Sequence, residues 1–200
     1  MKTPDLKSRS PDKKKKLREI KLATSLTGIY VVIEMITGYF TNSLSMTGDA
    51  FHMLIDLVAL IFAYFALRSS DSIEGKPSMA YIRANVILLI IVVMWIIKEA
   101  VSRLFLHNVQ VIGPPVLMVA GIGIFINLLV YKTLHHHKEE STRAAIACAL
   151  TDAVSLGIVI LSGLIITINK NLFWVDPIAS LAIVYYLGKV IYENTRLAFK

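Results

Sequence analysis

The chain has a single cysteine, Cys148, among its 200 residues, which excludes an intramolecular disulfide. It also has few charged residues, 18% of the total, and no stretch that could form a separate soluble domain. The first apolar run is long enough to cross a membrane, and no small-residue cleavage pattern follows it. We therefore expect no cleavable signal peptide.

Apolar residues are in excess. They make up 56% of the chain, against about 45–50% in soluble domains. They gather into runs with few charges, and about 18 or more such residues predict a membrane span. We predict an all-α integral membrane protein, with a basic tail at residues 1–20 and one six-helix bundle over residues 21–200. The predicted spans are 22–41, 48–67, 79–105, 111–133, 143–168 and 172–196.

The net charge of +7 comes mainly from basic residues crowded ahead of the first span. Such a tail is typical of a cytoplasmic N-terminus lying against anionic lipid, so we expect no nucleic-acid partner. Six spans place both termini on one side, and the Lys and Arg of alternate loops make that side cytoplasmic. Three basic residues depart from this distribution, because they lie toward the opposite side: Lys98, Arg103 and Lys170. The basic residues near the N-terminus are Lys13, Lys14, Lys15, Lys16, Arg18 and Lys21.

Asp49, His52 and Asp56 interrupt the second predicted span. A charged side chain in hydrocarbon costs at least about 2.5–3.5 kcal/mol, so such residues normally face the bundle interior and mark a pathway. At about 100° per residue, His52 and Asp56 differ by about 40° and Asp49 lies about 20° from Asp56. The three residues therefore share one helix face. His52 and Asp56, at i and i+4, can both reach one cation.

Cys148 and Asp152 repeat the i, i+4 spacing in the fifth predicted span. With His52 and Asp56 they offer one nitrogen, one sulfur and two oxygen ligands, a set that suits zinc, cadmium or cobalt better than magnesium or calcium. Manganese is a further candidate. Each residue also has a structural interpretation: a core histidine, a capping or paired aspartate, or a packing cysteine. The two matched pairs favour the metal site.

Other polar residues are candidates for accessory roles. Glu34 in the first span and Asn127 in the fourth are expected to face the bundle, either as hydrogen-bond partners or along a proton or ion pathway. Asp49 is expected to assist proton or ion entry, or to hydrogen-bond the ligands. A cytoplasmic loop carries either a weak metal-collecting site or solvated side chains at His135, His136 and His137.

Several segments resemble, in order, those of the cation diffusion facilitators, a family that includes the zinc transporters. They are NSLSMTGDAFHMLID (42–56), IKEAVSR (97–103), GIFINLLV (123–130), RAAIACALTDAVSLG (143–157) and DPIASL (176–181). The resemblance extends over about residues 18–198. It implies a six-helix membrane domain, usually homodimeric, with the metal site between the second and fifth helices. It also implies metal export from the cytoplasm in exchange for protons, which compete with metal for such ligands.

Cys148 departs from the family pattern, because zinc-selective relatives usually have His there and others have Asp. The chain also ends soon after the sixth span, so we expect no C-terminal cytoplasmic domain and a dimer that rests on membrane contacts. Two alternatives to a transporter remain. One is a non-transporting subunit of a heterodimer, and the other is an intramembrane enzyme with Cys148 as nucleophile and His52 as base. We expect no enzyme, and the cell membrane as location, with an organelle membrane as the alternative.

Overall fold

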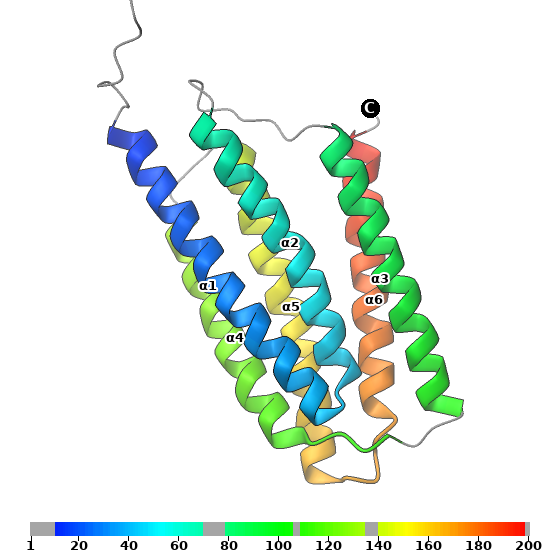
Figure 1. Cartoon of the computed structure of the whole chain (residues 1–200). Helices are drawn as coiled ribbons and strands as arrows, with labels where there is room; N and C mark the ends of the chain where they lie inside the picture. Colours follow the sequence, from blue (N-terminus) through cyan, green and yellow to red (C-terminus); the bar gives the residue numbers. More distant parts are fainter. Residues whose placement is uncertain (1–10, 70–78, 106–108, 135–139, 199–200) are drawn as a thin grey trace, which may run out of the picture.

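The computed structural model describes residues 11–69, 79–105, 109–134 and 140–198. These residues form six α-helices and no strand. α1 begins and α6 ends at the same end of the bundle (Figure 1), which we call the terminal end, and the opposite end is called the loop end. The prediction of an all-α membrane protein is confirmed. The helices are α1 (Pro11–Thr41), α2 (Leu44–Ser69), α3 (Met79–Phe105), α4 (Gly113–Leu134), α5 (Glu140–Ile168) and α6 (Val175–Ala198).

The helix bounds differ from the predicted spans mainly in α1. The span was predicted from residue 22, whereas the helix begins at Pro11. Lysines end a hydrophobic span but are good helix formers, and proline is favoured in a first helical turn. The basic segment predicted as a tail is therefore helical from residue 11. α3 has the predicted bounds, and α4 begins at Gly113, which is two residues after the predicted start of its span and is followed by two prolines.

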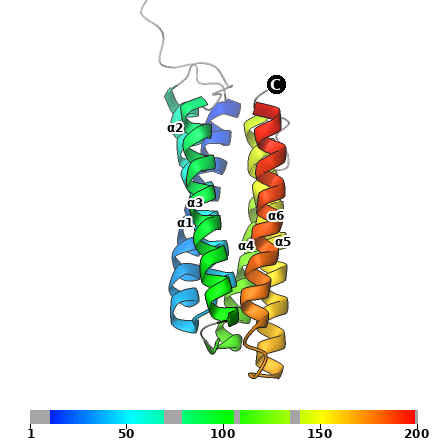
Figure 2. The ribbon, with the colours of Figure 1, turned by 90° about the vertical axis from the view of Figure 1, so that its right-hand side faces the viewer.

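Four helices form one group and two form a pair beside it. α1 packs against α2 and α4, and α4 packs against α5. α3 and α6 lie together, with α6 in contact with α2 and α5 and α3 in contact with α2 (Figures 1 and 2). α2 contacts α1, α3, α5 and α6 and so joins the group to the pair. Any polar side chain around α2 thus has several helices within reach.

The distribution of polar residues is that of a bundle in lipid. Large apolar side chains face outward on α1 and α4, for example Phe40 at 72% and Met118 at 70% exposure, while Glu34 is fully buried. Within the described residues, three segments are long and apolar enough to cross a membrane. α2, α3 and α6 run beside them over 24 to 27 residues, which at about 1.5 Å per residue exceeds a hydrocarbon core of about 30 Å. The three segments are Leu17–Thr41, Gly113–Lys132 and Leu150–Ile168.

The turn between α1 and α2 forces these helices into close contact at the loop end. Asn42 has a positive φ of 56°, and the amides of Asn42 and Ser43 bond back to the carbonyls of Tyr39 and Gly38, which is a Schellman motif. Gly38 then lies directly against α2. A Cβ added there would lie 2.6 Å from Thr47 Oγ1 and 3.0 Å from the Thr47 amide nitrogen.

We predict that Gly38→Ala lowers the free energy of unfolding by about 1–3 kcal/mol, because the added methyl group meets backbone that cannot move independently. Thermal unfolding of the purified protein in detergent measures this effect. Gly121→Ala is the matched control, since nothing lies within 4 Å of a Cβ at that position. Equal stability of the two variants would contradict the close contact between α1 and α2.

Candidate metal centre

α2 places two of the predicted residues in the bundle interior. Asp49 is fully buried and His52 is 4% exposed. Both lie on the side of α2 that meets α5, because each interacts with a residue of that helix. The shared helix face expected from their spacing brings them to one place at the centre of the bundle.

His52 and Asp152 meet across the interface between α2 and α5. The distance from His52 Nε2 to Asp152 Oδ1 is 3.7 Å, and both side chains are 5% exposed. An imidazole nitrogen and a carboxylate oxygen at this separation are two donors that converge on one small space, as zinc ligands from different helices must. Among the described residues, α2 and α5 thus bring one histidine and one aspartate together.

The two other predicted ligands are placed by their backbone alone. Asp56 lies one turn beyond His52 in α2, and Cys148 lies one turn before Asp152 in α5. Their side chains lie outside the described residues, as do the three histidines at 135–137. Among the side chains described, no group of three or more His, Cys, Asp or Glu could hold a metal ion. The described part of the centre is therefore the His52–Asp152 pair.

Ser155 is a member of the site that the sequence analysis missed. Its hydroxyl donates to Asp49 Oδ1 and lies 3.0 Å from the carbonyl oxygen of Asp152. The side chain is fully buried and thus bridges α2 and α5. One signal was available, since Ser155 follows Asp152 by three residues and helix geometry places it on nearly the same face.

Glu34 of α1 extends the acidic character of the site. It is fully buried, and its carboxyl interacts electrostatically with those of Asp49 and Asp152. The Tyr30 hydroxyl lies 3.3 Å from Glu34 Oε1 and donates to it. Asn127 of α4 is also buried, at 2% exposure, so both residues expected to face the bundle lie inside it.

Three acidic side chains lie buried close together in this part of the bundle, those of Glu34, Asp49 and Asp152. The His52 imidazole lies 3.7 Å from the Asp152 carboxyl. Like charges buried close together in a low-dielectric interior repel one another strongly, so such a group is stable only with a positive charge nearby.

Comparison with known proteins gives one family. A sequence model described as the cation efflux transmembrane domain matches residues 20–200. Zinc transporter ZitB of Yersinia pestis is 31% identical over 180 residues, covering 83% of this chain and 56% of the relative. Metal cation efflux system protein CzcD of Cupriavidus metallidurans is 31% identical over 192 residues, or 92% of this chain and 59% of that protein.

A third relative is described as a cadmium, cobalt and zinc/H(+)-K(+) antiporter of Bacillus velezensis. It is 29% identical over 184 residues, which is 86% of this chain and 58% of the relative. The chain thus spans a little over half the length of these relatives.

We predict that Ser155→Ala lowers the free energy of unfolding by about 1–2 kcal/mol, because a buried carboxyl loses a hydrogen-bond donor. Denaturant titration in mixed micelles measures the change. Ser162→Ala is the matched control on the same helix, since Ser162 is 2% exposed and its hydroxyl has no partner among the described residues. If both substitutions cost the same, the bond from Ser155 to Asp49 contributes nothing to stability.

Proposed function

The chain belongs to the family of cation efflux transmembrane domains, and from this premise we propose that it exports a divalent metal cation through a site between α2 and α5. Zinc is the first candidate substrate, with cadmium, cobalt and manganese as others. The observation that carries the proposal is the buried His52–Asp152 pair, which brings two zinc-type donors together from different helices. The names of the relatives, which refer to zinc, cadmium and cobalt, support the same substrate class.

The proposed ligand set is His52 and Asp56 from α2 with Cys148 and Asp152 from α5. Helix geometry supports it, because each pair is separated by one turn and His52 already meets Asp152. Within this set the imidazole and thiolate favour zinc over magnesium. Transport, rather than catalysis, is proposed because Asp at both i+4 positions serves metal binding better than nucleophilic attack by Cys148.

We propose that protons move against the metal by alternating access. The terminal end is taken as cytoplasmic from the charge of the loops, so the site loads from that end. Protons arriving from the loop end then displace the metal, since imidazole, thiolate and carboxylate bind one or the other. Glu34 and Asp49 are buried beside the site, and Asn127 lies inside the bundle, which supports the predicted role of these three residues along a proton or ion path.

The assembly and location follow the resemblance. We propose a homodimer held by contacts within the cell membrane, with lipid against the apolar outer faces of α1 and α4. A heterodimer and an organelle membrane are the alternatives. If this chain is instead the non-transporting partner in a heterodimer, Cys148 is a packing residue rather than a ligand.

The decisive experiment is zinc-driven proton flux in proteoliposomes that contain the purified chain alone. We expect flux from the unaltered protein and a loss of about tenfold or more in His52→Ala and Asp152→Ala, because each removes a metal donor. Glu99→Gln is the control, as it removes a carboxylate that is 37% exposed and pairs with Arg103 away from the site. Normal flux in both alanine variants would contradict the assignment of His52 and Asp152 as metal ligands. No flux with any of the four metals would point to the accessory subunit.

Exchanges at Cys148 test the second pair directly. We expect Cys148→His to favour zinc over cadmium relative to the unaltered protein, because the softer thiolate ligand is lost. Cys148→Ser should weaken the affinity for both metals. Isothermal titration of the three proteins with each metal, in detergent, measures the six affinities. Identical affinities in all three proteins would identify Cys148 as a packing residue.

A further inference from the structure

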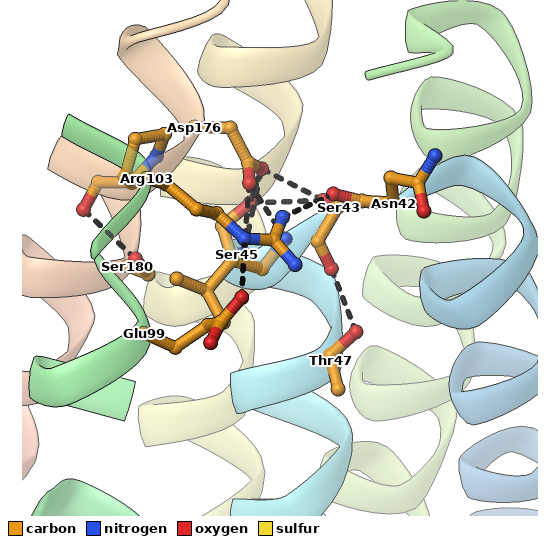
Figure 3. A network of polar contacts seen from close by, with 10 residues as sticks. Asn42, Ser43, Ser45, Thr47, Glu99, Arg103, Asp176 and Ser180 are labelled. Carbon is orange, nitrogen blue, oxygen red and sulfur yellow. Dashed lines mark hydrogen bonds and ion pairs between the residues drawn. The ribbon is translucent and has the colours of Figure 1, made fainter. Parts of the chain in front are cut away.

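Asp176, in the first turn of α6, makes a polar cluster with α2 that is separate from the candidate metal centre. Its carboxylate is 1% exposed. It accepts hydrogen bonds from the Leu44 amide at 2.6 Å, from Ser43 Oγ at 2.8 Å and from Ser45 Oγ at 2.6 Å. The Ser45 amide lies 3.4 Å from both carboxylate oxygens. We call Asp176 with Ser43, Leu44 and Ser45 the α2–α6 latch (Figure 3).

The latch supplies α2 with a cap that comes from another helix. The first amides of a helix have no partner within it, and the positive end of its dipole favours an anion. Ser43 meets part of this need locally, since its hydroxyl accepts from the Met46 amide at 3.3 Å. Asp176 meets the rest from α6. Because the carboxylate is almost fully buried, water does not compete for its donors.

The latch lies on the loop side of the candidate centre. Ser45 is one helical turn from Asp49, and Asp49 is nearly one turn from His52. The bond between Ser155 and Asp49 joins α2 to α5 on this same side. A third contact comes from Arg103 of α3. Its Nη1 atom donates a hydrogen bond of 2.5 Å to the Asn42 carbonyl oxygen in the turn before α2 (Figure 3). The loop side of α2 is therefore held to α3, α5 and α6 together.

We propose that Asp176 is a positioning residue for transport, which keeps the loop side of the metal site closed until the latch separates. This inference rests on the proposed function, because it takes the loop side as the side on which the metal is released. Release toward the loop end requires α2 to move away from α6, and that movement removes every donor from a buried carboxylate. The latch therefore sets how often the site opens to the loop side.

The single cysteine provides a direct test. Cys148 lies one turn beyond Asp152 toward the terminal end, so a reagent arriving from the loop end must pass both the latch and the site. In sealed, oriented vesicles free of metal, a small charged methanethiosulfonate reagent added to the loop side should modify the unaltered protein slowly. Asp176→Asn should react about tenfold or more faster, since an amide nitrogen cannot accept the serine and backbone donors.

Two further variants separate a latch from a general loss of structure. Ser45→Ala keeps the carboxylate and removes one donor, so its labelling rate should lie between those of the unaltered protein and Asp176→Asn. The exchange pair Asp176→Ser with Ser45→Asp returns a carboxylate and a hydroxyl to the same interface and should restore slow labelling. Ser180→Ala is the control, because it removes a buried hydroxyl of α6 that donates to the Pro177 carbonyl oxygen of its own helix and has no assigned bond to α2.

Zinc affinity and flux distinguish failure of the latch from failure of the proposed function. The latch predicts zinc affinity within about twofold of normal in Asp176→Asn and a reduced rate of coupled flux. Unchanged labelling in Asp176→Asn and Ser45→Ala, with zinc affinity retained, overturns the latch. Reduced flux with an unchanged labelling rate also overturns the latch, because Asp176 would then hold α2 and α6 together without controlling access to the site. The labelling rate can be measured in a protein that does not transport. Absence of flux in the unaltered protein would therefore disprove the proposed function, while the labelling rates would still test the latch.

Discussion

Burial of carboxylates inside a bundle with an apolar outer surface is the constraint on which the rest of this structure depends. Lipid offers no hydrogen bonds, so each acidic group within the spans must find its partners inside the protein. Asp49 bonds to Ser155 of α5, Glu34 to Tyr30 of its own helix, and Asp176 to the start of α2. These requirements explain why α2 lies where four other helices can reach it.

The turn between α1 and α2 concentrates much of this organisation in a few residues. It ends α1 through the positive φ of Asn42 and accepts a bond from Arg103 of α3. It also receives the amide of Ile112, ahead of α4, at the Thr41 carbonyl, and it presents Ser43 to Asp176. A short turn thereby sets the positions of four helices at the loop end. Gly38 and Thr47 bring α1 and α2 into close contact at the same end.

Much of this architecture could be predicted from the sequence, because hydropathy, loop charge and helical spacing act over short distances. The six helices and the shared face of Asp49 and His52 follow from such local patterns. The helical extension of α1 to Pro11 did not follow, since hydropathy marks where a chain enters lipid and not where a helix begins. Ser155 and Asp176 were missed as site and latch residues because their partners lie 106 and about 130 residues away. The spacing of three residues from Asp152 was a local signal for Ser155, but no local pattern indicates the contact of Asp176 with α2.

The buried acidic groups of Glu34, Asp49 and Asp152 have a consequence for the proposed coupling of metal to protons. In the proposed exchange, a loaded site carries a divalent ion against its carboxylates, and a returning site carries protons against the same groups. Either cargo offsets part of the negative charge of these groups, which lowers the cost of moving the site within a low-dielectric bundle. A site with neither cargo would have to move bare negative charge through that interior, which the Coulomb and desolvation terms oppose. In the proposed exchange, charge balance therefore opposes reorientation of the empty site, and the α2–α6 latch acts in addition to it.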